Sequence, residues 1–209
     1  MSGRGRWVDP FAGIPGRRLF IAVPLDAAAA EAVTGIVDAV RAQPLPAGDR
    51  DVRWVRLDGL HLTLRFLGPT TDARIDPATA AMRGVAASTP PATGRFTGTG
   101  VFPPGGRPRT LWIGMDDGAM TLDTLARDLN AALESAGWPR DDRPFRAHLT
   151  LARSDGIAAG SLVAGRLAAA LGDRSIPFAI DRLVLYESVT GGGAARYVPV
   201  TEAPLTDGP

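Results

Sequence analysis

The sequence predicts an α+β fold in which two similar lobes face each other. The sheets are expected to be mostly antiparallel. The chain has 209 residues, 45% hydrophobic and 22% charged, so it can bury a sizeable core. Strand-like and helix-like segments follow one another without the regular alternation of a doubly wound parallel sheet. One tetrapeptide occurs twice, which suggests two related lobes.

The amino-terminal segments are expected to form a tail, a strand and a helix. Residues 1–16 mix Gly, Arg and Pro without a period, which predicts a flexible tail before a single domain over residues 17–205. An apolar run over residues 19–23 ends at Pro24 and predicts a buried strand. Asp26 can cap the helix that follows. The apolar residues at helical spacing in that helix are Val33, Ile36, Val37 and Val40.

The middle of the chain predicts four strands and one helix. The strands are residues 52–56, 60–67, 95–102 and 110–115. An Asp58-Gly59 turn separates the first two of them. Asp76-Pro77 is typical of a helix start, and the helix is expected to end near Ser88.

The last third of the chain repeats the mixture of helices and strands. Its first helix carries one apolar face and stops at Gly137. That face consists of Leu122, Leu125, Leu129 and Leu133. Strands are then expected over residues 146–152, 178–188 and 196–200, and a helix over residues 161–171. The run Gly191 to Gly193 is interpreted as a flexible hairpin tip.

Composition excludes several function classes. Lys and Arg total 23 against 22 for Asp and Glu, and a net charge of +1 argues against coating long nucleic acid. The chain has no cysteine, which excludes disulfides, thiolate metal sites and cysteine nucleophiles and predicts a cytoplasmic protein. It has no lysine either, so Schiff-base and phosphate-loop lysines are excluded. No apolar run reaches the roughly 18 residues of a membrane helix, so we expect no membrane contact.

The two histidines of the chain open the same tetrapeptide. Residues 61–64 and 148–151 both read His-Leu-Thr-Leu. On ideal strands the leucines point to a core, while His61, Thr63 and Arg65 share the other face, as do Arg146, His148 and Thr150. Two such strands facing each other would bring an acid, a base and two hydroxyl donors around one central oxyanion.

This constellation suits displacement at a phosphodiester. The attacking oxygen loses a proton on one side of phosphorus while the leaving oxygen gains one on the opposite side. Hydroxyl and guanidinium groups can hold the phosphoryl oxygens between them. A metal site is a poor alternative, because two histidines lack a nearby carboxylate cluster or cysteine. We therefore expect no metal and no cofactor, and we find no nucleophile elbow of the serine hydrolases.

The sequence resembles the 2H phosphoesterase superfamily, and within it the LigT-like RNA 2′,3′-cyclic phosphodiesterases (ThpR family). The resemblance extends from about Arg18 to Leu205 and is carried by residues 61–68, 143–153 and 183–188. Gly59 stands where an Asn is common, and Ala147 where a Pro is common. The resemblance implies a bilobal α+β fold, with two mostly antiparallel sheets, outer helices and the site in a central cleft between the lobes. It also implies metal-independent opening of a terminal 2′,3′-cyclic phosphate on RNA to a 2′-phosphate.

The resemblance also implies roles for individual residues. His61 would donate the proton to the leaving 3′ oxygen, and His148 would activate water. Thr63 and Thr150 would hold phosphoryl oxygens, and Arg153 matches a family phosphate-binding arginine. On an ideal strand Arg153 points away from His148, so the strand must end or bulge near Ala152 for Arg153 to reach the site.

Four further residues are candidates for substrate binding. Arg65 and Arg146 have the correct strand parity and are rival phosphate ligands. Phe20 and Tyr197 are possible base-stacking aromatics, with core packing as the alternative for Phe20.

Three alternatives to an RNA-specific hydrolase are compatible with the sequence. A 5′ hydroxyl in place of water would make the same site a 2′–5′ RNA ligase. The substrate can also be a small cyclic nucleotide rather than an RNA end. A module that binds RNA ends without turnover is the alternative from another class, although binding alone would not require two titratable groups. We expect a monomer.

Overall fold

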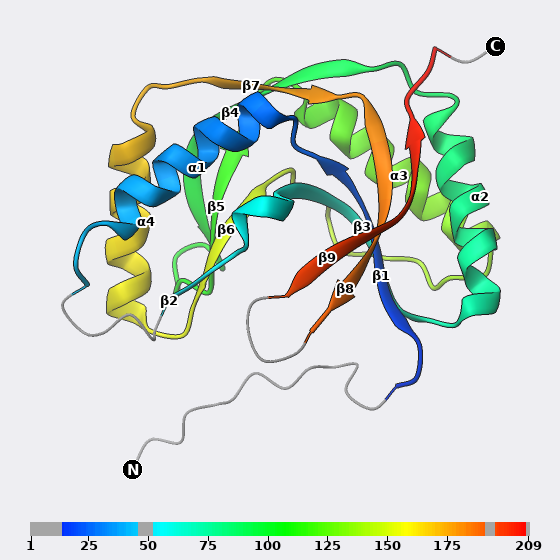
Figure 1. Cartoon of the computed structure of the whole chain (residues 1–209), viewed down its shortest axis with the longest axis horizontal. Helices are drawn as coiled ribbons and strands as arrows, with labels where there is room; N and C mark the ends of the chain where they lie inside the picture. Colours follow the sequence, from blue (N-terminus) through cyan, green and yellow to red (C-terminus); the bar gives the residue numbers. More distant parts are fainter. Residues whose placement is uncertain (1–13, 46–51, 191–194, 208–209) are drawn as a thin grey trace.

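The computed structural model describes residues 14–45, 52–190 and 195–207 of the chain. Most of the predicted tail over residues 1–16 and the whole Gly191 to Gly193 run lie outside this described part, and their predicted flexibility stays a prediction. The described residues form two antiparallel sheets with helices on their outer sides, as the sequence predicts (Figure 1).

The first sheet has four strands in the order β3-β1-β8-β9. These are β1 (Arg17–Pro24), β3 (His61–Thr70), β8 (Arg182–Val189) and β9 (Arg196–Pro204). Helices α2 (Ile75–Ala86) and α3 (Ala119–Ser135) pack against this sheet. Strand β1 is an inner strand, paired on both sides, and its residues Leu19 to Val23 form the continuous buried run that the sequence predicts.

The second sheet has five strands in the order β2-β6-β5-β4-β7. These are β2 (Val52–Trp54), β4 (Ala92–Phe102), β5 (Thr110–Met115), β6 (Leu149–Ser154) and β7 (Ile176–Ile180). Helices α1 (Ala27–Arg41) and α4 (Ile157–Leu171) pack against it. The two lobes are interleaved along the chain rather than formed by its two halves (Figure 1).

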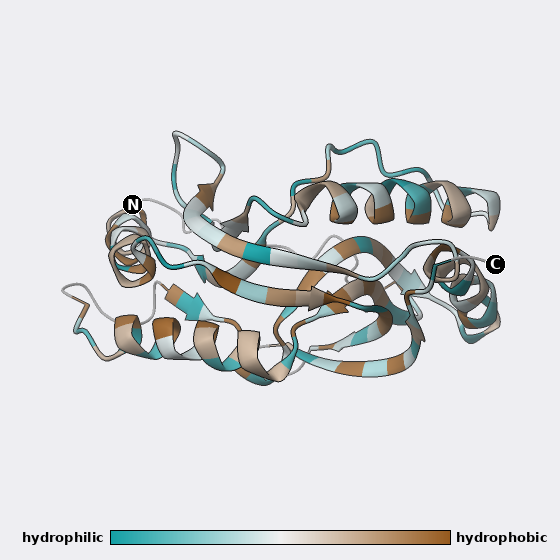
Figure 2. Ribbon diagram, turned by 90° about the horizontal axis from the view of Figure 1, so that it is seen from above, coloured by the Kyte–Doolittle hydropathy of each residue, from teal (hydrophilic) through white to brown (hydrophobic). Residues whose placement is uncertain are grey.

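The helices follow the predicted apolar faces. Asp26 caps α1 by accepting a hydrogen bond from the Ala29 N–H at 2.9 Å, and its second oxygen accepts one from the Ala179 N–H in β7 at 2.8 Å. All four predicted apolar residues of α1 are buried, as are the four leucines of α3. Figure 2 shows that hydrophobic and hydrophilic residues alternate along the helices. No helix among the described residues is long and apolar enough to cross a membrane.

Strands β2 and β3 do not pair with each other, although a turn separates them in the sequence. Strand β2 pairs with β6 in the second sheet, and β3 pairs with β1 in the first. A short 3₁₀ helix, Leu57–Gly59, takes the place of the predicted turn. The connection is held at both ends, because the Val55 N–H donates to the Leu151 carbonyl and the Leu25 N–H donates to the Leu60 carbonyl. This segment therefore joins the two sheets beside both repeated motifs.

Candidate active site

The two motifs occupy equivalent places in the two sheets. His61 is the first residue of β3, and His148 directly precedes β6, which begins later than the predicted residue 146. The motif leucines are buried, as the alternation predicts, whereas Thr63 and Thr150 are partly exposed. Neither threonine hydroxyl has a hydrogen-bond partner within the described ranges. Both hydroxyls are thus available to a ligand.

Each histidine ring is held by the backbone in the same way. Nδ1 of His61 lies 2.7 Å from the Gly59 carbonyl oxygen, and Nδ1 of His148 lies 2.7 Å from the Arg146 carbonyl oxygen. A carbonyl oxygen only accepts hydrogen bonds, so Nδ1 must carry the proton in both rings. In each neutral imidazole Nε2 is then the unprotonated nitrogen, ready to accept a proton or, once protonated, to give one away.

His61 lies in an aromatic cluster of the first sheet. Its ring centroid is 4.8 Å from that of Phe20 and 4.7 Å from that of Tyr197. Phe20 is only 1% exposed, which leaves no free face for a nucleobase and supports its core-packing role. Tyr197 is partly exposed and stays a candidate for stacking. Burial lowers the pKa of His61 below its usual value, and the hydrogen bond to Gly59 opposes this shift.

His148 lies against aromatic rings of the second sheet. Its ring makes edge contacts with Phe102, at 5.0 Å between centroids, and with Trp112, at 6.3 Å. Burial lowers the pKa of His148, the hydrogen bond to Arg146 raises it, and the positive charge of Arg153 lowers it further. Both histidines are therefore biased toward the neutral form in the free protein.

A bulge in β6 brings Arg153 to the side of the sheet that carries Thr150. Trp112 of β5 pairs with Thr150, but its neighbour Leu111 pairs with Ala152, so Leu151 is the extra residue. Strand parity reverses at this point: Leu151 and Ala152 are both buried, and Arg153 is exposed. The bulge that Arg153 requires is present where the sequence analysis expected it.

The same bulge occurs in β3 and overturns the predicted orientation of Arg65. Ile21 pairs with Arg65 and Ala22 pairs with Thr63, so Leu64 is the extra residue. Arg65 consequently turns to the opposite side from Thr63 and is only 8% exposed. It cannot be the phosphate ligand that ideal alternation suggested.

Arg65 instead holds the segment that leads to the second motif. Its guanidinium donates to the carbonyl oxygens of Phe66 and Pro139 and lies 3.4 Å from the Asp141 carboxylate. Hydrogen bonding to Arg143 lowers the pKa of Asp141 to about 2, so this carboxylate stays ionised. Arg146 is exposed and stays an untested candidate for phosphate binding.

The β3 bulge exposes an aromatic residue that ideal alternation placed in the core. Phe66 occupies the position in the first motif that Arg153 occupies in the second, five residues after the histidine. It is 52% exposed, and its ring lies 5.9 Å from that of Phe20. A bulge depends on pairing with a distant strand, so the local pattern carried no signal for this exposure.

Three observations indicate that the two motifs lie close together in the fold. Strands β3 and β6 are in contact although they belong to different sheets. The Val55 N–H, on the connection to β3, donates to the carbonyl of the bulged Leu151. Burial raises the pKa of Tyr197, whose ring contacts that of His61, and the positive charge of Arg153 partly offsets this rise. The same charge lowers the pKa of His148. Arg153 therefore acts on residues in both motif regions.

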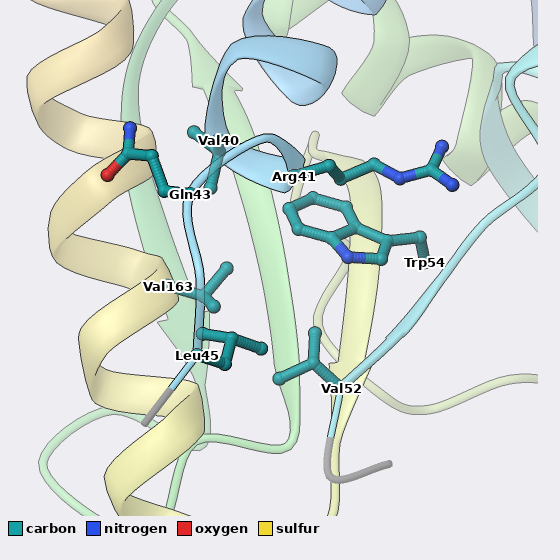
Figure 3. A pocket seen from close by; sticks show the side chains of 7 residues that line it. All are labelled: Val40, Arg41, Gln43, Leu45, Val52, Trp54 and Val163. Atoms are coloured by element: carbon teal, nitrogen blue, oxygen red, sulfur yellow. The ribbon is translucent and has the colours of Figure 1, made fainter. Parts of the chain in front are cut away.

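A cavity of about 270 Å³ lies beside the second sheet (Figure 3). It opens between α1, α4 and β2, and the residues that line it include Arg41, Trp54 and Val163. None of its lining residues is a predicted site residue. Its walls offer no acid–base pair, so the chemistry points to the motif strands rather than to this cavity.

Comparison with known proteins gives a family and a fold. Residues 24–192 match the family described as the 2′-5′ RNA ligase superfamily. An RNA 2′,3′-cyclic phosphodiesterase of Geobacillus stearothermophilus is 33% identical over 192 residues, which cover 91% of this chain and 58% of that protein. A protein of the same description from Archaeoglobus fulgidus is 34% identical over 137 residues, which cover 65% and 72%. The chain thus spans less than two thirds of the length of the Geobacillus protein.

The fold agrees with an experimental structure. The crystal structure of Escherichia coli LigT complexed with 3′-AMP is 26% identical in sequence and gives a TM-score of 0.68, with 91% of this chain and 98% of that chain covered. The predicted class of two antiparallel sheets with outer helices is therefore confirmed.

Proposed function

Because the chain belongs to the 2′-5′ RNA ligase superfamily, we propose that it opens terminal 2′,3′-cyclic phosphates of RNA to 2′-phosphates, with two histidines as acid and base. The observation that carries this proposal is the matched hydrogen bonding of both imidazoles. It leaves Nε2 of each ring as the group that exchanges protons. The names of the Geobacillus and Archaeoglobus relatives support the choice of substrate.

The proposed reaction divides two proton transfers between the histidines. Nε2 of neutral His148 takes a proton from water as the water oxygen attacks phosphorus. The bond between phosphorus and the 3′ oxygen breaks, and protonated Nε2 of His61 gives its proton to that oxygen. The products are a 2′-phosphate and a free 3′ hydroxyl. Each histidine ends in the protonation state in which the other began, so proton exchange with solvent restores the enzyme.

Thr63, Thr150 and Arg153 are proposed to hold the phosphoryl oxygens during the reaction. The unpartnered threonine hydroxyls and the guanidinium of Arg153 supply donors for charge that develops in the transition state. Arg153 has no carboxylate partner among the residues that the structure describes, so its charge is available to an anion. The predicted domain limits, residues 17–205, include all of these groups.

We expect hydrolysis to proceed without an added metal ion, because the two imidazoles provide both proton transfers. The test is an RNA oligonucleotide ending in a 2′,3′-cyclic phosphate, incubated with the protein in EDTA. Chromatography against 2′-phosphate and 3′-phosphate standards should identify the 2′-phosphate at an unchanged rate. A rate that collapses in EDTA and returns with zinc or magnesium contradicts the proposed mechanism.

A second candidate function is 2′–5′ RNA ligation, which the description of the matched family favours. A 5′ hydroxyl would replace water in the same in-line attack on the cyclic phosphate. The same assay separates the two functions when an RNA with a 5′ hydroxyl is added. A longer product that resists a 3′–5′-specific ribonuclease identifies ligation, whereas release of the 2′-phosphate alone identifies hydrolysis.

The pH dependence of kcat/KM should peak below about 6.5. Burial lowers the pKa of both histidines in the free protein. Activity rises with pH as the base loses its proton and falls with pH as the acid loses its own, so the maximum lies between two lowered pKa values. A bound phosphate anion favours both imidazolium forms, which should move the kcat profile to higher pH than the kcat/KM profile. Steady-state rates from pH 4 to 9 test this, and a kcat/KM maximum above neutral pH contradicts it.

The oligomeric state, the cellular location and the range of substrates are also matters of proposal. We propose that it acts as a monomer in the cytoplasm, on RNA ends or on small cyclic nucleotides, without a cofactor. The near-neutral charge supports a local contact with one phosphate rather than a long nucleic-acid track. Light scattering of the purified protein would measure its oligomeric state.

A further inference from the structure

We infer that Arg65 is a positioning residue, which fixes the segment that carries His148 relative to the strand that carries His61. This inference rests on the proposed function, because a two-histidine reaction requires the two rings to keep a set separation. Arg65 and His61 lie on the same strand, β3, in the first sheet. His148 enters the second sheet from residues 139–147, which connect α3 to β6 and form neither helix nor strand.

Side chains, rather than a backbone ladder, hold residues 139–147 in place. Within the described ranges, no backbone–backbone hydrogen bond anchors this segment. Asn130 of α3 bonds the backbone of Asp141 twice: its Nδ2 donates to the carbonyl oxygen at 3.1 Å, and its Oδ1 accepts from the N–H at 3.0 Å. Arg65 donates to the Pro139 carbonyl oxygen, and its guanidinium lies 3.4 Å from the Asp141 carboxylate. Asp141 is therefore the point at which β3 and α3 together hold the segment.

The same segment sets the orientation of the His148 ring. Arg143 donates to both oxygens of the Asp141 carboxylate, at 2.8 and 2.7 Å, which ties the segment to the same anchor. Further along, the Arg146 carbonyl oxygen lies 2.7 Å from Nδ1 of His148 and selects the tautomer with a free Nε2. A shift of this segment would therefore turn or release the ring that is proposed to activate water.

The repeated fold does not itself require a buried arginine at this position. The matching position of the second motif, four residues after its histidine, holds the small and buried Ala152. Arg65 is only 8% exposed, and its Nε has no hydrogen-bond partner in the described part of the chain. Burial of a guanidinium is unfavourable unless its polar contacts compensate, so an apolar side chain would fill this space more favourably. The contacts to Pro139 and Asp141 are what the arginine adds.

The first test observes both histidine rings by NMR. The chain has two histidines, so ¹⁵N-labelled histidine gives two sets of ring signals, recorded at pH 8 where both rings are neutral. In Arg65→Met the Nδ1 and Nε2 shifts of His148 should converge, because a ring that loses the Arg146 carbonyl loses its preferred tautomer. The shifts of His61 should not change, since its partner is the Gly59 carbonyl on another segment. Equal changes in both rings, or no change in His148, overturn the inference.

The second test measures the reaction itself. Arg65→Met should lower kcat for a nucleoside 2′,3′-cyclic phosphate roughly 10- to 100-fold and change KM far less, because a misplaced base loses contacts made in the transition state. Asp141 keeps Arg143 as its partner in this variant, so the protein should fold. Arg65→Lys keeps the charge but cannot reproduce the guanidinium fork, so it should recover only part of kcat. An unchanged kcat in Arg65→Met, or full recovery in Arg65→Lys, overturns the inference.

Two further variants keep these tests decisive. Asn130→Ala releases the same segment from the side of α3 and should give the same His148 signature, even if Arg65→Met fails to fold. Arg17→Met removes an arginine that pairs with Glu187 at the end of β1 remote from the first motif, and it should change neither ring nor kcat. The NMR test needs no turnover. If the His148 signals respond selectively but the wild type opens no cyclic phosphate, the positioning role stands and the proposed reaction fails.

Discussion

Replacing His148 with Ala is expected to lower kcat for cyclic phosphate opening by roughly 10²–10⁴-fold, the usual contribution of a positioned acid or base. His61→Ala should cause a loss in the same range, because each ring presents one free Nε2 to the site. The measurement is kcat on a nucleoside 2′,3′-cyclic phosphate, since KM should change far less than kcat for a group that acts on protons in the transition state.

Controls must separate chemistry from stability in these two variants. Both rings pack against aromatic neighbours, so circular dichroism and thermal unfolding should accompany the kinetics. The double variant provides a further check: two groups that serve one transition state should lose less together than the product of the two single losses. A folded His148→Ala variant that retains most of its kcat contradicts the proposed role of this histidine.

Arg153→Gln is expected to lower kcat/KM by roughly 10²–10³-fold, as for other donors that stabilise developing charge. The β6 bulge turns this guanidinium to the side of Thr150, and no carboxylate neutralises it in the described residues. Its charge also lowers the pKa of His148, so its loss should move the base limb of the pH profile to higher pH.

The matched control for Arg153 is Arg127→Gln. Arg127 is exposed on α3 and paired with Asp128, so the variant loses one positive charge at a distance from the motifs. It should behave like the wild type. Equal activity of the two variants would mean that Arg153 contributes no more than general charge.

The sequence was sufficient for those features that depend on local pattern. The cap at Asp26, the apolar face of α3 and the buried leucines of both motifs agree with the structure, because helical and strand periods are set by nearby residues. The duplicated tetrapeptide likewise predicted two related sheets with the histidines in equivalent places.

Features that depend on distant pairing could not be predicted in this way. Nothing local marks Leu64 and Leu151 as bulged residues. The Leu64 bulge nevertheless buries Arg65 and exposes Phe66, and the Leu151 bulge turns Arg153 to the side of Thr150. Only the family resemblance pointed to Arg153 as a phosphate ligand and hence to a bulge near it. Ideal alternation alone would have placed Arg153 on the wrong side of the strand. For the same reason the sequence did not predict that Trp112 lies beside His148, because its place opposite Thr150 follows from strand order.

The division of roles between the two histidines is the central claim, and the most direct test varies the leaving group. A phenolate leaves without a proton, so catechol cyclic phosphate should need a base but little help from an acid. On this substrate His61→Ala should recover most of its lost kcat, while His148→Ala should remain impaired. Equal recovery of both variants, or preferential recovery of His148→Ala, would contradict the assignment of His61 as the acid and His148 as the base.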